Sequence, residues 1–210
     1  MRPVTKCRFT PISYVYDPYG DAKDELIQAI GSYCSYCERP GYSSALDVEH
    51  IRDKKTHPKR KLLWRNFLLG CKNCNPVKST KSILNMYFPT VDNTYEILNY
   101  DRLGQVTINT ARLTTLAEIN KAQRLIDLIG LDRRPGHPKF SKNDKRWSER
   151  QDAYLLAEKY LPKYQAGDVD ADTIIELAKA KGFWSTWMTV FSSEVAVLKK
   201  LISDFPGTRV

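Results

Sequence analysis

Two cysteine pairs are the residues of this sequence whose spacing most directly indicates chemistry. They lie in "CSYC" (Cys34, Cys37) and "CKNC" (Cys71, Cys74). Two Cys-x-x-Cys pairs can present four thiolates to one tetrahedral ion, which is typical of a closed structural zinc site. A redox dithiol needs only one such pair, and a reducing compartment disfavours two disulfides. The spacing therefore predicts structural Zn²⁺ on these four cysteines.

A carboxylate and a histidine stand side by side in "LDVEHIRDKK", where Glu49 directly precedes His50. Successive side chains of a regular strand point to opposite faces, so both can serve one site only if the strand ends there. The residues after Ile51 are charged and reach Pro58, which predicts a strand end at His50 and an exposed loop beyond it. Asp47 shares the face of Glu49 if the strand is regular, and could be an outer partner of the site.

The positive charge of the chain is concentrated in its N-terminal part. The formal net charge is +9, and residues 1–90 hold 15 Lys and Arg against 8 Asp and Glu. Seven cations accompany one acid between residues 52 and 65. Such a local field suits a polyanion such as nucleic acid, and equally a solvated loop. The candidate nucleic-acid contacts are Arg52, Lys54, Lys55, Lys59, Arg60, Lys61 and Arg65.

Length and composition are typical of a globular protein. A chain of 210 residues with 42% hydrophobic and 11% aromatic residues suffices for one compact domain or two small ones. No apolar run reaches the roughly 18 residues of a membrane span, and the N-terminus lacks a signal-peptide pattern. The sequence therefore predicts a cytoplasmic protein with no membrane partner.

Short elements are expected around these motifs. A helix with Asp21 as its N-cap leads into the first cysteine pair, and "SALDV" is a strand candidate. After Cys74, a helix is expected with Asn75 as N-cap and Pro76 at its first position. Strand, basic loop, cysteine pair and helix thus follow one another within residues 1–90, which form the first predicted domain.

Residues 91–210 are predicted to form a small hairpin followed by a mostly helical region. The hairpin turns near residues 103 and 104, and apolar residues at helical spacing then continue to Gly130. "RRPGHPKFSKND" is a linker rich in Pro and Gly. Further helices are expected at 146–162, at 171–181 and around 184–203.

In combination, "YCSYCE", "DVEHI" and "WRNFLLGCKNCNPVKSTK" resemble an HNH endonuclease, a ββα-metal nuclease motif braced by a four-cysteine zinc knuckle. The resemblance covers residues 33–81. It implies an α+β fold with a ββα-metal HNH core and structural zinc, followed by the hairpin and the helical region. The implied activity is hydrolysis of phosphodiester bonds in DNA or RNA, with Mg²⁺ or Mn²⁺ as the catalytic ion.

The resemblance also assigns roles to single residues. His50 matches the general base that takes a proton from water. Glu49 and Asn75 match the protein ligands of the catalytic ion. Asn66 matches the asparagine that ties the loop to the strand through backbone hydrogen bonds. Lys78, one helical turn after Asn75, is placed to meet a phosphate oxygen near a helix N-terminus.

Each of these roles has an ordinary structural alternative. A lone histidine is usually a surface or packed residue, which is also the expectation for His57 and His137. Asn75 could simply cap a helix, and Asn66 could be a turn residue. Lys78 could be no more than a lysine on the surface of a helix.

A further resemblance extends over the whole chain. "MRPVTK", "DPYGDAKDELIQAIGSYCSYCE", "FWSTWMTVFSSE" and "FPGT" are similar to stand-alone bacterial HNH proteins. Some of these partner an ABC-type ATPase in anti-phage systems of the Septu type. The chain has no phosphate-loop motif, so any ATP dependence would come from another protein. Two alternatives stay open: a zinc-braced nucleic-acid-binding module without catalysis, and an interaction subunit that is silent until an ATPase binds.

Overall fold

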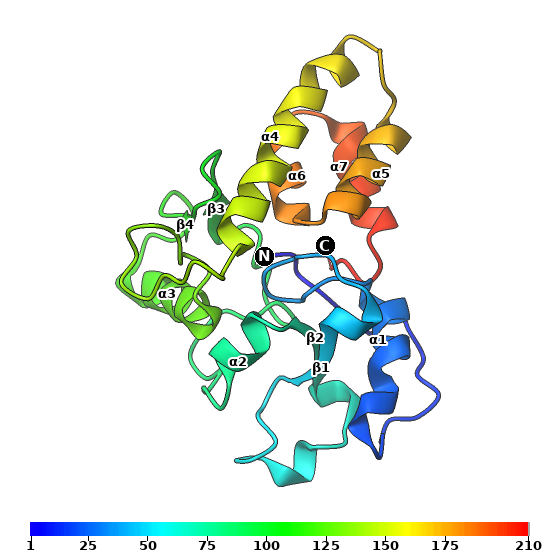
Figure 1. The fold of residues 1–210 in the computed structure, drawn as a ribbon, viewed down its shortest axis with the longest axis vertical. Helices are drawn as coiled ribbons and strands as arrows, with labels where there is room; N and C mark the ends of the chain where they lie inside the picture. The colour runs from blue at the N-terminus through cyan, green and yellow to red at the C-terminus, as the bar shows by residue number, and fades with distance from the viewer. Residues whose placement is uncertain (210) are drawn as a thin grey trace.

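The cysteine and histidine motifs lie on a two-stranded hairpin and the helices around it (Figure 1). The computed structural model describes residues 1–209. The elements of this part are α1 (Lys23–Ile30), β1 (Leu46–His50), β2 (Phe67–Cys71) and α2 (Cys74–Lys78). Four short 3-10 turns accompany them, at Tyr19–Ala22, Ser43–Ala45, Pro58–Arg60 and Trp64–Asn66.

The hairpin is antiparallel, and its register pairs Asp47 with Gly70 and His50 with Phe67. All five residues of β2 are buried, because the strand contacts α1 as well as α2. A strand that is buried in this way has a continuous run of apolar residues, as in "FLLGC". The predicted strand end at His50 is confirmed.

The predicted hairpin and helical region beyond residue 90 are also confirmed. The hairpin consists of β3 (Leu98–Tyr100) and β4 (Val106–Ile108). The helices are α3 (Leu116–Ile129), α4 (Arg146–Gln165), α5 (Ala171–Lys181), α6 (Trp184–Val190) and α7 (Val195–Asp204). α3 ends at Gly130, whose left-handed backbone closes the helix as its sequence position predicts. The segment around 184–203 contains two helices, because the chain turns between α6 and α7.

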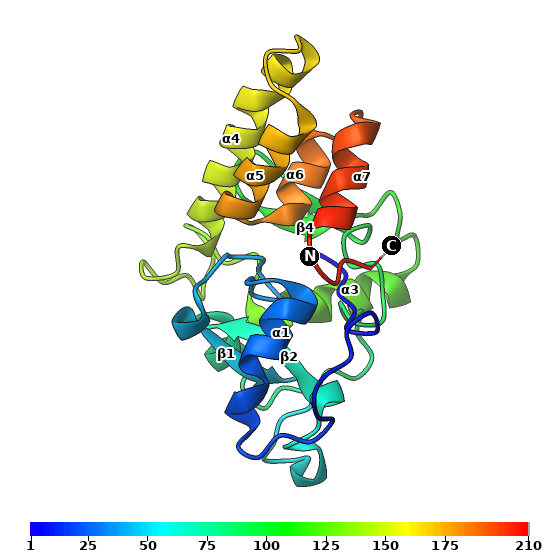
Figure 2. The same cartoon turned by 90° about the vertical axis from the view of Figure 1, so that its right-hand side faces the viewer.

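Buried apolar side chains form two clusters. Figures 1 and 2 show α4 to α7 gathered at one end of the molecule and the β1–β2 hairpin with α1 at the other. One cluster lies among α4 to α7. The other includes α1, the hairpin and α3, and so contains residues on both sides of residue 90. The division of the chain at residue 90 stays a prediction. Within residues 1–209, no helix combines the length and apolar character that a membrane crossing requires.

Two predicted helix starts are wrong. Asp21 lies inside the 3-10 turn Tyr19–Ala22 and does not cap α1, whose N-cap is Ala22. α2 begins at Cys74 with Asn73 as N-cap, so Asn75 lies inside the helix. The backbone N–H of Cys74 donates to Sγ of Cys71 at 3.4 Å, and this contact starts the helix earlier than the capping pattern predicts.

Candidate active site and zinc centre

The four predicted zinc ligands lie together. Their sulfur atoms are within 4.8 Å of one another, and all four side chains are buried. Cys34 and Cys37 follow α1, Cys71 ends β2 and Cys74 begins α2. The sulfurs of Cys37 and Cys71 are 3.7 Å apart. A tetrahedral ion with Zn–S bonds of about 2.3 Å requires edges of about 3.8 Å, so the cluster fits structural zinc.

An arginine of the C-terminal region contacts the zinc centre. Nη1 of Arg146 donates to Sγ of Cys74 at 3.2 Å, and the guanidinium pairs with Asp144 at 2.6 Å. Four thiolates on Zn²⁺ carry a net charge of about −2, which a neighbouring buried cation offsets. Arg146 also donates to the carbonyls of Ile129 and Gly130, so the centre connects the hairpin with α3 and α4. No local motif around Arg146 indicates this role.

Glu49 belongs to β1, and its side chain, which contacts Lys78 of α2, is buried; the residue is only 2% exposed. Its Oε1 is 2.7 Å from Nζ of Lys78, and its Oε2 accepts a hydrogen bond from the Tyr36 hydroxyl at 2.5 Å. Burial raises the pKa of Glu49, and the positive charge of Lys78 opposes this rise. A carboxylate has about four lone-pair positions, so two are not used by these contacts. Glu49 is not among the residues that line the cavity beside His50.

Lys78 occupies a different place from the one that the resemblance implies. It is fully buried, and its ammonium contacts Glu49 and donates to the backbone carbonyl of His50 at 2.7 Å. A buried carboxylate needs a compensating cation, which explains why the lysine points inward. In this structure Lys78 therefore holds the end of β1 and does not face solvent, where a phosphate would bind.

We expect Lys78→Met to lower the free energy of unfolding by roughly 3–5 kcal/mol, because it leaves Glu49 buried without its counterion. Urea denaturation followed by circular dichroism measures this loss. Lys59→Met, at an exposed lysine of the basic loop, is the control and should change little. Adding Glu49→Gln to Lys78→Met should recover part of the stability. Wild-type stability of Lys78→Met would contradict this account of the pair.

Asn75 lies beside Glu49, over Gly70. A Cβ built on Gly70 would be 3.1 Å from Cβ and Cγ of Glu49 and 3.4 Å from Cβ of Asn75. The missing side chain therefore lets α2 approach the hairpin closely. Nδ2 of Asn75 donates to Oδ2 of Asp47 at 3.3 Å, which leaves Oδ1 turned away from Asp47 and able to bind a cation. This contact matches the outer role expected of Asp47.

His50 is held in an orientation suited to a general base. Its Nε2 is 2.8 Å from the carbonyl oxygen of Lys61. A carbonyl can only accept, so Nε2 carries the proton and Nδ1 of the neutral ring has a free lone pair. Tyr19 and Phe67 pack edge-on against the ring, with centroids 4.7 and 5.3 Å away.

The surroundings of His50 favour its neutral form. Burial lowers the pKa of His50 below its ordinary value. The hydrogen bond to the Lys61 carbonyl opposes this shift, and the charges of nearby lysines add to it. The ring lines a cavity of about 400 Å³ together with Asp47 and Asn75. A proton acceptor and two oxygen-bearing side chains thus face the same space.

Asn66 is 3% exposed and fastens both ends of the basic loop. Its Oδ1 accepts the backbone N–H of Arg52 at 2.9 Å, and its Nδ2 donates to the Arg52 carbonyl at 2.9 Å. Nδ2 also donates to the carbonyl of Arg60 at 3.1 Å. These are backbone hydrogen bonds of the kind that the resemblance implies for this asparagine.

The seven cations of the basic loop lie on the surface, and Arg52 is the least exposed of them. Within residues 1–209, none of the seven forms an ion pair. Lys54 reaches back over the Tyr19 ring, 4.4 Å from its centroid, and lines the cavity of His50. The other histidines lie outside this cavity: His57 is near Asp53 and His137 is near Asp132.

The β1–β2 hairpin, the helix after it and the four-cysteine cluster together define an HNH domain of the ββα-metal class. Residues 34–81 match the model of the HNH endonuclease family. The matched range contains the four cysteines and the predicted catalytic residues. No curated protein matches the chain. The predicted fold class is therefore confirmed, and the domain indicates metal-dependent nuclease activity.

Proposed function

We propose that the protein is an endonuclease that hydrolyses phosphodiester bonds of nucleic acid with Mg²⁺ or Mn²⁺. The observation that carries this proposal is the orientation of His50. Its Nε2 is committed to the Lys61 carbonyl, which leaves Nδ1 of the neutral ring unprotonated, and the ring lines a cavity together with Asn75. A zinc-braced binding module would not need a histidine kept neutral and fixed in this way.

Each residue of the site has a defined task in the proposed reaction. Nδ1 of His50 takes the proton of the attacking water, while the Lys61 carbonyl holds the ring in place. Glu49 and Asn75 would hold the divalent ion, and Asp47 orients the Asn75 amide. When bound, the ion neutralises charge on the phosphate oxygens. Carboxylate and amide oxygens suit Mg²⁺ and Mn²⁺, so the donor set fits.

The ligand assignment predicts the effects of two substitutions. We expect Glu49→Gln and Asn75→Ala to raise the Mn²⁺ concentration needed for half-maximal cleavage by roughly tenfold or more. The first substitution replaces a charged ligand oxygen by a neutral one, and the second removes a ligand oxygen. Electron paramagnetic resonance of bound Mn²⁺ gives a readout that does not depend on cleavage. Asn143→Ala, at an exposed asparagine outside the site, is the control. Unchanged Mn²⁺ affinity in both site variants would contradict the assignment.

We further propose that the nuclease works with an ABC-type ATPase subunit in a bacterial anti-phage system. The resemblance of the whole chain to stand-alone HNH proteins supports this proposal, and residues 91–210 are then available for partner or substrate contacts. Cleavage by the chain co-purified with the product of a neighbouring ATPase gene tests it. ATP-dependent cleavage supports the partnership, whereas full activity of the chain alone, unchanged by ATP and partner, contradicts it.

A further inference from the structure

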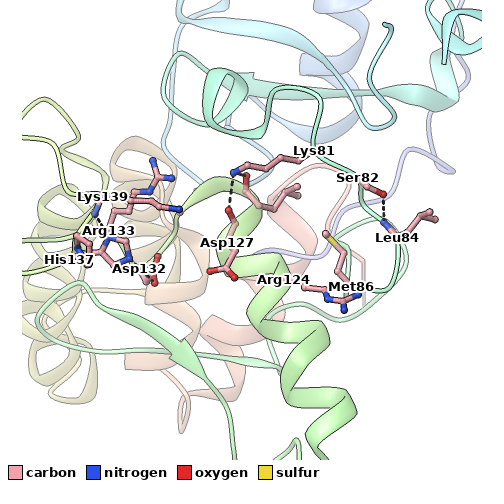
Figure 3. A pocket seen from close by; sticks show the side chains of 13 residues that line it. Lys81, Ser82, Leu84, Met86, Arg124, Asp127, Asp132, Arg133, His137 and Lys139 are labelled. Atoms are coloured by element: carbon pink, nitrogen blue, oxygen red, sulfur yellow. Dashed lines mark hydrogen bonds and ion pairs between the residues drawn. The ribbon is translucent and has the colours of Figure 1, made fainter. Parts of the chain in front are cut away.

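A second cavity, of about 500 Å³, lies between the segment that follows α2 and the C-terminal half of α3. Figure 3 shows the side chains that line it. None of them belongs to the catalytic residues or the zinc ligands. Two carboxylates, Asp127 and Asp132, face four cations. The cations are Lys81, Arg124, Arg133 and Lys139.

The two carboxylates already have partners other than these cations. Asp132 is 3.5 Å from Nε2 of His137, and Asp127 accepts a hydrogen bond from Nε2 of Gln123 at 3.0 Å. Within the described residues, none of the four cations forms an ion pair. The cavity therefore keeps an excess of positive charge that its own acids do not cancel.

The cations that have hydrogen bonds use neutral backbone acceptors. Lys81 donates to the carbonyls of Asp127 and Leu128 at 3.1 and 3.0 Å, and Arg124 donates to that of Asn85 at 3.3 Å. The side chains of the other two cations have no hydrogen-bond acceptor within residues 1–209. Their donors are available to a ligand.

Three of the cations also act on one another. The side chain of Arg133 folds over Gly130, where an added Cβ would be 2.2 Å from its Nε. Figure 3 shows Arg133 and Lys139 together on one flank of the cavity. Burial lowers the pKa of Lys81, the charges of Arg133 and Lys139 lower it further, and Asp127 opposes this shift to a smaller extent. Like charges held this close repel, and a bound anion relieves that repulsion.

We propose that this cavity binds a phosphate group. The planar Arg133 guanidinium can donate two parallel hydrogen bonds to phosphate oxygens, and Lys139 and Lys81 add point charges beside it. The group can come from the backbone of a nucleic acid or from a free phosphate compound. The inference that the phosphate belongs to a nucleic-acid backbone rests on the proposed function. This source is favoured because Lys81 follows α2 closely, the helix that contains Asn75 and contacts both the catalytic hairpin and α3.

A pair of double variants tests the proposal. Arg133→Gln/Lys139→Gln removes two charges from the cavity. Arg134→Gln/Lys142→Gln removes the same charge from the same segment, at residues that do not line the cavity. Fluorescence anisotropy with labelled single-stranded and duplex oligonucleotides, at several KCl concentrations and without Mg²⁺ or Mn²⁺, measures affinity while cleavage is off. Thermal unfolding with added inorganic phosphate tests the free source.

For a backbone phosphate, we expect the cavity variant to lose at least about tenfold in oligonucleotide affinity relative to the control variant. The log–log salt slope should become shallower by about 0.9 for a duplex. For a free phosphate compound, inorganic phosphate raises the Tm of the wild type and the control variant but not of the cavity variant, and oligonucleotide affinities stay equal.

Equal behaviour of the two double variants in both assays overturns the proposal, and so does the absence of saturable phosphate or oligonucleotide binding by the wild type. The outcome is separable from that of the proposed function, because no step of the binding assays requires cleavage. A protein that binds phosphate in this cavity but never cleaves would refute the nuclease and keep the site.

Discussion

Cys71→Ser protein is expected to contain less than one equivalent of zinc and to lose the cooperative unfolding of its HNH domain. A serine hydroxyl stays protonated near neutral pH and does not replace the thiolate as a zinc ligand. Zinc in small structural motifs supplies an apparent binding free energy of about 10 to 16 kcal/mol. Here it would join the segment after α1 to β2 and α2. Elemental analysis and thermal circular dichroism measure the two effects.

The fifth cysteine provides the control for this experiment. Cys7 is exposed and lies outside the cluster, so Cys7→Ser should retain zinc and melt like the wild type. The wild type should lose structure when a strong chelator removes its zinc and regain it when Zn²⁺ is restored. Full zinc content and an unchanged melting curve in Cys71→Ser would refute the structural role of the metal.

His50→Ala is expected to lower phosphodiester hydrolysis by roughly two to four orders of magnitude, the usual contribution of a general base. His50 is not one of the four residues of the zinc cluster, so the variant should keep its zinc. Its affinity for nucleic acid should stay close to that of the wild type, because all seven cations of the basic loop are retained. Single-turnover cleavage with Mg²⁺ or Mn²⁺, in the presence of the ATPase partner if one is required, measures the loss.

A second histidine and a second substitution make this test specific. His57 is half-exposed near Asp53 and does not line the cavity, so His57→Ala should cleave normally. His50→Gln keeps a donor for the Lys61 carbonyl but has no basic nitrogen, so it should be as inactive as His50→Ala. It provides the test if the alanine variant folds poorly. Wild-type cleavage by folded His50→Gln protein would disprove the proposed base.

The sequence indicated the parts of the site that depend on local spacing. Two Cys-x-x-Cys pairs restrict four thiolates to one ion, whatever the rest of the fold does. A charged run after an apolar segment ends a strand because charged residues are rarely buried, and β1 ends at His50 for this reason. The end of α3 at Gly130 can likewise be predicted from the sequence, because a glycine adopts the left-handed conformation that closes a helix at low cost.

Contacts between distant residues were decided only by the tertiary structure. Whether Lys78 faces solvent or contacts Glu49 depends on how closely α2 approaches the hairpin. The sequence shows that both residues are charged, but it does not show that both are removed from water. The same holds for Arg146, which reaches Cys74 across 72 positions of the chain. The excess positive charge around Arg133 arises because α3 and the linker fold back beside the segment after α2. Spacing along the chain determines which atoms can share an ion, whereas packing in three dimensions determines which charges must find a partner.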